Sequence, residues 1–524
     1  MIDHFPFYLT LIIVIVLLIV VADKIKVAYP VVLVVAGLLI SFIPGIPVLH
    51  IQPELIFIIF LPPLLYDAAF AISWKELWKW RRIISSFAFI VVFFTACSVA
   101  IAANLFLPGM SLAIGFLLGG IVSPPDAVSA SAILKFVKVP RRVSSILEGE
   151  SLLNDASSLI IFRFAMVAVA TGQFIWLDAT LSFLWMVIGG AGIGLLVGWL
   201  FIKIHRLLPK DANLHIVMSL VTPYVMYIAA EEVHSSGILS VVSGGLFLSS
   251  RRNFFLDSSS RVRGANVWES LVFVFNGLVF LLIGLDLPEI SQGLKQEGIS
   301  LPTATAYGLL ITAVLIIVRF IASFGALIFT KIAARFITVA DRNPGIKGPI
   351  VLGWAGMRGV VSLAAALSIP VEVSAGVPFP HRNLILFITF IVIITTLLLQ
   401  GLTLPYLIKK VNLPDFHDYI SEDEAESLIK SGLAESTLQH INTNHGERLN
   451  IDHRLQQLVA RWEVVNKSSG KESVFENKEI HYDILELQRQ WLLNKNKADN
   501  KIDEEVIRKF LYQIDLEEEK IKNS

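Results

Sequence analysis

The chain has 524 residues, of which 55% are hydrophobic and 16% are charged, whereas about 25% of the residues in soluble domains are charged. This composition excludes an ordinary soluble enzyme, and the apolar part is too long for a single membrane anchor. The 43 basic residues equal the 43 acidic residues in number, so net charge gives no reason to expect nucleic acid as a partner. The single cysteine, Cys97, excludes an intramolecular disulfide and a cysteine-rich metal site.

Charge is distributed unevenly along the chain. From residue 411 onward there are 23 acidic and 15 basic residues, a net charge of −8, so residues 1–410 carry +8. We expect residues 1–410 to form a transmembrane domain and residues 411–524 to form an acidic, mainly helical cytoplasmic tail. Apolar residues recur at helical spacing in the tail over 454–465 and 482–493. The tail is predicted to be a small helical domain or a dimer-packing arm, or else to regulate the protein by sensing pH or binding a small ligand.

Long apolar segments fill the first part of the chain. A membrane-spanning helix requires about 20 mostly apolar residues, and this criterion predicts spans at 7–23, 27–43, 54–72, 83–107, 111–134, 144–171, 181–202, 213–232, 237–250, 267–285, 303–330, 349–370 and 384–408. The first segment lacks the basic start and the small-residue cleavage site of a signal peptide, so it is predicted to be a retained helix. The sequence therefore predicts an all-α polytopic membrane protein with about 13 transmembrane helices.

Basic residues in the loops between these segments alternate from one side to the other. Lys and Arg concentrate on the cytoplasmic side of membrane proteins. Alternate loops hold 21 of them, whereas the intervening loops hold only Lys295 and Arg382. This alternation predicts an external N-terminus and a cytoplasmic tail for a protein of the plasma (inner) membrane.

Two of the predicted spans contain residues that interrupt a helix. The fifth span contains SPPDAV at 123–128, and the twelfth contains GWAGMRGV at 353–360. Thirteen spans divide naturally into six, a linker and six, so the fifth span corresponds to the twelfth. The two are seven spans apart, and this odd number means that they cross the membrane in opposite directions. Broken helices at corresponding positions of two inverted halves are typical of the midplane site of secondary transporters. We therefore predict two inverted six-helix repeats with crossed broken helices.

Acidic residues at mid-membrane depth indicate the candidate ion site, because a charge inside the bilayer costs about 2.5 kcal/mol or more. Asp126 lies in the break of the fifth span, and Asp155 lies near the middle of the sixth. Ser151 precedes Asp155 by one helical turn on the same face. Carboxylate, hydroxyl and unwound backbone carbonyl oxygens suit a small hard cation. The sequence therefore predicts a small hard cation at Asp155, Asp126 and Ser151.

The remaining buried charges are predicted to pair, because an unpaired charge inside a protein is costly. Arg358, in the twelfth span, is the expected partner of Glu150. Arg163 is expected to neutralise another carboxylate, for which Asp67 is the candidate. Arg319 lies nearer a span end, where we expect a structural or snorkelling role rather than transport.

A buried carboxylate of this kind allows a proton and a cation to be exchanged. Burial in a low-dielectric environment favours the neutral form of a carboxyl group, whereas a bound cation favours the ionised form. Proton and cation then compete for Asp155, and their gradients are coupled if only the occupied site crosses the membrane. No motif for enzymatic catalysis stands out, and no cofactor is expected beyond the substrate ions.

Five segments carry a more specific signal: GESLLNDAS at 149–157, FLPPLLYDAAF at 60–70, GGIVSPPDAV at 119–128, EEVHSSGILSVVSGGL at 231–246 and GWAGMRGVVSLAAAL at 353–367. Together they resemble the monovalent cation:proton antiporters of the sodium/proton exchanger kind, the NhaP and NHE group. The resemblance covers about residues 1–410.

This resemblance implies a homodimer in which a core bundle moves against a dimerisation scaffold. It implies that Asp155 is the exchanging carboxylate and that Asp126 and Ser151 help to bind the ion. Asn154, which stands where other relatives have a second Asp, resembles the electroneutral branch, which exchanges one cation for one proton.

The chain departs from the family pattern at the first break. Many relatives have Thr-Asp-Pro there, whereas this chain has PDA at 125–127. The threonine ligand is therefore missing, and Ser123 is the candidate substitute. The resemblance also assigns Glu150 and Arg358 to a structural ion pair in the core.

The predicted function is electroneutral exchange of Na⁺ for H⁺ by alternating access, with Li⁺ or K⁺ as further substrates and a role in intracellular pH and sodium homeostasis. A K⁺/H⁺ antiporter of the same fold is the alternative. A cation channel has less support, because a channel requires a repeated filter or a ring of charges from several subunits. The acids here are single and lie within one inverted pair of segments.

Overall fold

The structure is a computed structural model that describes residues 5–43, 58–134, 137, 139–172, 176–285, 287–336, 345–374, 377–413, 420–449, 456, 459–460, 478–499 and 501–523. The chain forms two compact units. The membrane unit comprises Met1–Leu207, Val217–Arg252 and Trp268–Pro414, and the tail unit comprises Leu208–Ile216, Asn253–Val267 and Asp415–Ser524. The division differs from the predicted one at residue 410, because two short segments from the first part of the chain pack with the tail.

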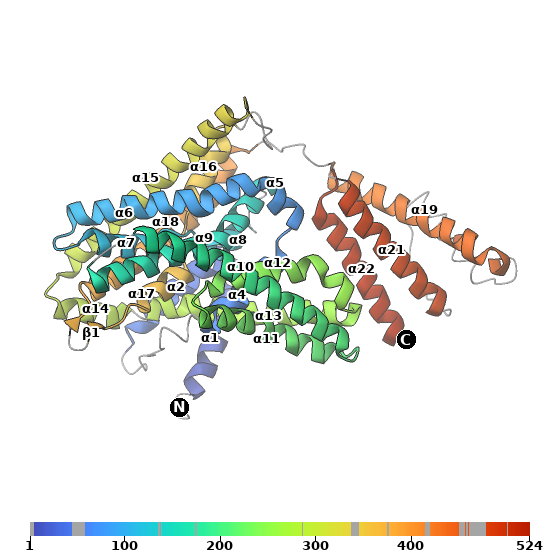
Figure 1. Cartoon of the computed structure of the whole chain (residues 1–524), viewed down its shortest axis with the longest axis horizontal. Coiled ribbons are helices and arrows are strands. Elements are labelled where there is room, and N and C mark those ends of the chain that lie inside the picture. The colour runs from blue at the N-terminus through green and yellow to red at the C-terminus, as the bar shows by residue number, and fades with distance from the viewer. Residues whose placement is uncertain are drawn as a thin grey trace. The chain divides into compact units, whose positions relative to one another are not determined.

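Helices build almost all of the membrane unit (Figure 1). In chain order its elements are α1 (Phe5–Ile25), α2 (Tyr29–Ser41), α4 (Leu61–Ala71), α5 (Trp74–Ser85), η2 (Ser86–Val91), α6 (Val92–Phe106), α7 (Leu112–Val122), α8 (Ala127–Leu134), α9 (Arg141–Thr171), α10 (Trp176–Leu207), α11 (Ala212–Glu232), α12 (Gly237–Phe255), α13 (Ser258–Leu285), α14 (Leu287–Gln296), α15 (Leu301–Ala333), α16 (Lys347–Trp354), α17 (Val360–Leu367), β1 (Glu372–Ser374), β2 (Val377–Pro378) and α18 (Arg382–Val411). The first residues of α11 and α13 belong to the tail unit.

Long apolar helices make this a polytopic helical membrane protein. Among the described residues, seven helices are long and apolar enough to cross a membrane, and α2 and α7 are shorter apolar helices. Each range predicted as a span falls on a described helix or on consecutive ones, with residues 54–57 outside the described part. The largest differences are at the tenth span, where α13 begins at Ser258 rather than at 267, and at the fourth span, whose first helix, α5, begins at Trp74 rather than at 83. Ser73 caps it, because its Oγ accepts a hydrogen bond from the Glu76 amide at 3.2 Å.

Two small features were not predicted from the sequence. Helix α14 is amphipathic and too short to meet the span criterion. It is tied to the start of α18, where the Asn383 side chain donates a hydrogen bond to the Gly293 carbonyl at 3.2 Å. Strands β1 and β2 form a short antiparallel hairpin between α17 and α18. Both features connect apolar helices at one end of the unit.

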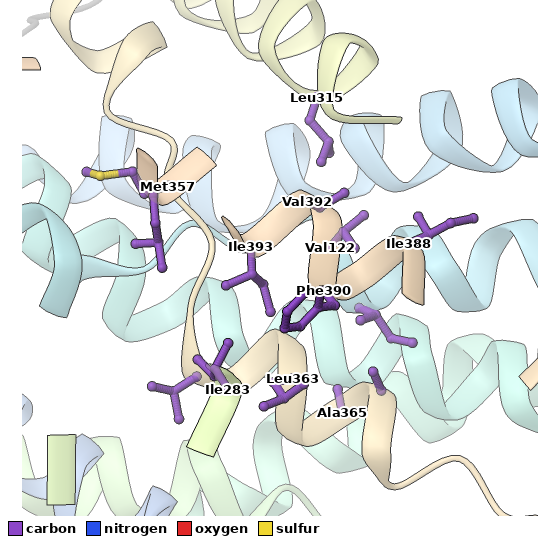
Figure 2. Packing of buried hydrophobic residues seen from close by; sticks show 14 of the residues in the cluster. Val122, Ile283, Leu315, Met357, Leu363, Ala365, Ile388, Phe390, Val392 and Ile393 are labelled. Atoms are coloured by element: carbon purple, nitrogen blue, oxygen red, sulfur yellow. The ribbon is translucent and has the colours of Figure 1, made fainter. Parts of the chain in front are cut away.

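Helix α18 forms the centre of the membrane unit. Its sequence is apolar all round, which is typical of a helix buried on every side. In its most apolar 18-residue window 72% of the residues are buried, against 33% for the corresponding window of α10. Figure 2 shows Phe390 and Ile393 of α18 near Val122 of α7 and Leu363 of α17. The two interrupted helix pairs therefore pack against one continuous, buried helix.

Glycines allow the closest helix contacts in this unit. Gly284 of α13 lies against the backbone of α2 at Val34 and Gly37, so closely that a Cβ at residue 284 would collide with main-chain atoms. Gly119 of α7 lies in the same way against Ala96 of α6. Small residues drive helix association in membranes because they bring backbones together and increase packing.

The tail unit combines the tail helices with two segments from the first part of the chain, which contain the start of α11, the end of α12 and the first turns of α13. Helices α19 (Glu422–Leu449), α21 (Lys478–Ala498) and α22 (Glu504–Asn523) bury a small apolar core, and Figure 1 shows α21 beside α22. The predicted helical segment at 482–493 falls within α21. The one at 454–465 lies outside the described residues, apart from residues 456, 459 and 460.

An ion-pair network holds this tail unit together. Asp515 of α22 accepts hydrogen bonds from Arg261 of α13 at 2.8 Å and from Arg489 of α21 at 3.1 Å. Burial lowers the pKa of Arg489, but its hydrogen bond to Glu518 and the charges of Glu518 and Asp515 outweigh this effect and raise the pKa. Arg489 therefore stays charged and helps to neutralise the buried carboxylate of Asp515, which bonds to both α13 and α21.

Gly284→Ala is expected to lower the free energy of unfolding by about 1–3 kcal/mol, because the added methyl group forces α2 and α13 apart. Gly325→Ala in α15 is the matched control, since no atom lies within 4 Å of the position of its Cβ. Denaturant unfolding of both variants in detergent, followed by circular dichroism, measures the difference. Equal stability of the two variants would contradict the close packing at Gly284.

Candidate functional site

Two interrupted helices of the membrane unit meet at their breaks. Residues 123–126 separate α7 from α8, and residues 355–359 separate α16 from α17. The Asp126 amide donates a hydrogen bond to the Met357 carbonyl at 2.8 Å. Gly359 lies so close to the Asp126 carboxylate that a Cβ at residue 359 would overlap its oxygens. The unwound backbone of one break is thus satisfied by the other, as the absence of water in a bilayer requires.

The Asp126 carboxylate caps the second half-helix, α8. It accepts hydrogen bonds from the Val128 amide at 3.0 Å, the Ser129 amide at 3.3 Å and the Ser129 hydroxyl at 2.5 Å. These amides belong to the first helical turn, which has no intrahelical acceptors and carries the positive end of the helix dipole. This role of Ser129 was not predicted from the sequence, although an Asp just before a helix start is a common capping signal. A carboxylate has about four acceptor positions, so one remains for a further ligand.

Arg358 donates hydrogen bonds from its guanidinium to backbone carbonyls at the two breaks. Its Nε donates to the Val122 carbonyl at 2.5 Å, its Nη1 donates to the Gly356 carbonyl, and its amide donates to the Thr396 hydroxyl at 3.1 Å. Val122 is the last residue of α7, whose free carbonyls carry the negative end of the helix dipole. The buried guanidinium therefore stabilises the unwound conformation.

The predicted pair between Glu150 and Arg358 is wrong. Glu150 is fully buried and accepts hydrogen bonds from Nη1 and Nη2 of Arg319 at 2.5 and 2.8 Å. Arg319 also donates from Nε to the Leu352 carbonyl at 3.3 Å. Snorkelling is excluded for Arg319, which is 3% exposed. Its helix, α15, packs against α16 and so turns this arginine inward, which sequence position alone does not reveal.

Arg163 neutralises a carboxylate, as predicted, but the partner is Glu231 and not Asp67. Nη2 of Arg163 donates to both carboxylate oxygens of Glu231 at 2.8 and 2.7 Å. Glu231 is in the last turn of α11 and also accepts a hydrogen bond from the Gly237 amide at 3.1 Å. No role was predicted for Glu231, although two adjacent acids at the end of a predicted span were a visible signal.

Asp155 lies on α9 and is 7% exposed. The helix around it is fixed by hydroxyl groups: Ser157 donates to the Ala88 carbonyl of η2 at 2.5 Å, and Ser158 donates to the Asp155 carbonyl at 3.1 Å. The carboxylate of Asp126 is near enough for its charge to act on Asp155. The structure therefore brings together the two acids that the sequence places at similar depth.

Neutral oxygens lie beside these acids. Asn154 links α9 to the first break, since its Nδ2 donates to the Pro125 carbonyl at 3.1 Å. Its Oδ1 and the Ser123 hydroxyl oxygen are buried and have no hydrogen-bond partner within the described part of the chain. A buried polar atom without a partner costs free energy unless a ligand or water satisfies it. Ser151, 8% exposed, lies one turn before Asp155.

These groups together can hold one small cation or a proton. They comprise the Asp126 carboxylate and the Ser123 hydroxyl at the first break, and the Asp155 carboxylate, the Ser151 hydroxyl and the Asn154 amide oxygen on α9. This donor set suits a hard monovalent ion. Within the described part of the chain, no group of three or more His, Cys, Asp or Glu residues could hold a metal ion.

Comparison with known proteins relates this arrangement to ion exchangers. The family model described as the transmembrane part of sodium/hydrogen exchangers matches residues 10–410. An antiporter of Bacillus pumilus for sodium, potassium, lithium and rubidium is 34% identical over 391 residues, which are 73% of this chain and 58% of that protein. The chain thus spans less than two thirds of the length of this relative.

Two other relatives match a larger share of their own length. An uncharacterized Na⁺/H⁺ exchanger of Mycobacterium tuberculosis is 30% identical over 511 residues, 95% of this chain and 93% of that protein. A low-affinity Na⁺/H⁺ antiporter of Synechocystis is 33% identical over 398 residues, 74% of this chain and 70% of that protein.

The fold is similar to a solved structure. A sodium proton antiporter from Methanocaldococcus jannaschii, solved at pH 8, aligns with a TM-score of 0.61 at 19% sequence identity. The alignment covers 78% of this chain and 99% of that one. At this identity the likeness concerns the fold alone.

Arg319→Leu is expected to lower the free energy of unfolding by about 3–5 kcal/mol, because it leaves Glu150 buried without its partner. The double variant Glu150→Leu/Arg319→Leu is expected to recover most of this loss, since the unpaired charge is removed as well. Denaturant unfolding in detergent compares these proteins with Arg335→Leu, which changes an exposed arginine just beyond the same helix. A loss no larger than that of Arg335→Leu would contradict a stabilising buried pair.

Proposed function

Since the chain belongs to the sodium/hydrogen exchanger family, we propose that it exchanges Na⁺ for H⁺ across the membrane as a secondary active transporter. The observation that carries this proposal is the meeting of the two helix breaks at Asp126, beside Asp155. Buried carboxylates at mid-membrane depth mark ion pathways. The buried oxygens Oδ1 of Asn154 and Oγ of Ser123, which have no hydrogen-bond partner in the described part of the chain, complete a site for one small ion.

Each residue has a distinct role in the proposed site. Asp155 is the exchanging carboxylate, because it lies on α9 with a small exposed fraction and next to a second acid. Asp126 contributes its remaining acceptor position. Ser151, Ser123 and the Oδ1 atom of Asn154 add neutral oxygens, and Ser123 replaces the hydroxyl of the missing threonine.

Competition for Asp155 couples the two ions. A cation bound at Asp155 requires the ionised carboxylate, and a proton bound there removes the charge that attracts the cation. If α9 and the broken helices move across the membrane only with the site occupied, cation transport in one direction requires proton transport in the other. This scheme needs no cofactor beyond the substrate ions.

A neutral residue next to Asp155 favours electroneutral exchange. Asn154 carries no charge and holds the Pro125 carbonyl, so Asp155 provides the charge that changes during the cycle. Asp126 is already compensated by the amides and hydroxyl at the start of α8. One cation is therefore exchanged for one proton.

The proposed membrane arrangement has 13 spans in two inverted six-helix repeats. In this arrangement α7–α8 and α16–α17 are the equivalent broken pairs, and they meet at their breaks as crossed helices of opposite direction would. The basic loops place the N-terminus outside and the tail inside the plasma membrane. The protein is proposed to be a homodimer with a role in pH and sodium homeostasis.

Potassium is the second candidate cation. The Bacillus pumilus relative is named for sodium, potassium, lithium and rubidium, and this chain lacks the threonine of the usual first break. A site with fewer fixed ligands would accept a range of ion sizes. A K⁺/H⁺ antiporter of the same fold is therefore the alternative, and Li⁺ is a further substrate in either case.

Asp155→Asn is expected to abolish cation-driven proton movement and to leave the fold intact, because the amide cannot exchange a proton. The purified full-length protein is placed in sealed liposomes with a pH dye inside, and Na⁺, K⁺ and Li⁺ are added in turn. The membrane voltage is clamped and then released. Electroneutral exchange is expected to be independent of the clamp.

The control is Glu148→Gln, which removes an exposed carboxylate from the same helix and is expected to retain exchange. Thermal unfolding of both variants separates lost activity from lost structure. Exchange that persists in a folded Asp155→Asn variant would overturn the assignment of the exchanging carboxylate. Proton movement that occurs only under the voltage clamp would overturn the one-to-one stoichiometry.

A further inference from the structure

A cavity of about 580 Å³ lies in the membrane unit beside the proposed ion site. The helix α9 forms one wall from Ala156 to Arg163, and α11 with the start of α12 forms the opposite wall from Tyr227 to Ile238. Ala156 directly follows Asp155 in α9. Asp155 itself is not among the lining residues, so the cavity in this conformation ends at the turn that carries the exchanging carboxylate.

The ion pair between Arg163 and Glu231 spans this cavity. Both residues line it, and their side chains are 39% and 31% exposed. Arg163 follows Asp155 by eight residues, which is about 12 Å along the axis of α9. An ion that passed through the cavity toward Asp155 would therefore pass the pair first.

The two partners belong to different packing groups. The helix that carries Arg163, α9, packs against the broken helices through α7 and α8. Glu231 is on α11, which packs against α12, where the Cβ of an alanine at Gly244 would collide with Met226. The pair therefore joins the helices of the ion site to the helices on the other side of the cavity.

Glu231 neutralises the positive charge of Arg163 in the lining of the cavity. Arg163 alone would repel a cation at this point, because a positive charge acts over distances of this order in a partly desolvated site. The hydrogen bonds from its Nη2 to both carboxylate oxygens of Glu231 neutralise this charge. The adjacent Glu232 adds a negative charge, and His234 lines the same cavity.

We infer that this cavity is the aqueous vestibule through which monovalent cations reach Asp155 from the membrane face at which α9 ends, and that Glu231 admits them by neutralising Arg163. In the orientation proposed above this is the external face. The inference rests on the proposed antiport. Glu231 is a positioning residue in this scheme, because it acts through Arg163, whereas Asp155 remains the residue that binds the ion.

Four variants of the full-length protein test the inference in the liposome assay, with external Na⁺ varied: Glu231→Gln, Arg163→Gln, the double variant, and Glu232→Gln as the control. Glu231→Gln keeps the acceptor for the Gly237 amide but leaves Arg163 unpaired. The apparent KM for Na⁺ is expected to rise about threefold to tenfold, with a smaller rise at high choline chloride because salt screens the charge. The double variant is expected to return to within about twofold of the unmodified protein, since both charges are gone.

The control and the outcomes separate this inference from the proposed function. Glu232→Gln removes a charge from the same cavity without breaking the pair and is expected to change KM less than Glu231→Gln. A double variant as impaired as Glu231→Gln, or a fall in maximal rate with unchanged KM, would show that the ion pair has only a structural role. Either result would overturn the inference. Unchanged KM in Glu231→Gln would overturn it as well. Absence of exchange in the unmodified protein would instead count against the antiport itself.

Discussion

The contact between the two helix breaks is the constraint on which the rest of the membrane unit depends. Unwound backbone has no water to bond with inside a bilayer, so its amides and carbonyls need partners from the protein. Here one break supplies the partner of the other, through the Asp126 amide and the Met357 carbonyl. This contact requires glycine at residue 359, where a side chain would displace the Asp126 carboxylate.

Buried charge in the unit is balanced by backbone as well as by ion pairs. Asp126 is stabilised by the start of α8, and Arg358 is stabilised by the carbonyl at the end of α7. Half-helix ends carry partial charges of the required sign, so a broken helix can hold an acid and a base without pairing them to each other. Glu150 and Arg319 form the separate ion pair that ties α9 to α15.

The sequence was a sound guide to the helices and to the depth of the acidic residues. Long apolar runs must be buried in lipid or in protein, so the described parts of the predicted spans fall on helices, with boundaries shifted by up to nine residues. Depth along a helix follows from residue number, which is why Asp126 and Asp155 are found together. The start of α5 was missed because its residues are too polar for a span criterion, and the amphipathic α14 was missed for the same reason.

Partners across helices required the tertiary structure. The sequence shows that Glu150 needs a cation, but the rotation of α15 about its axis determines that Arg319 reaches it and Arg358 does not. Arg163 likewise meets Glu231 because α9 faces α11. The sequence alone determined the composition, the periodicity of apolar residues and the depth of the acidic residues in the membrane. These properties depend on moving each side chain from water into an apolar environment, which is a local effect. Which charge faces which was decided by helix packing, because packing sets the rotation and crossing of helices far apart in the chain.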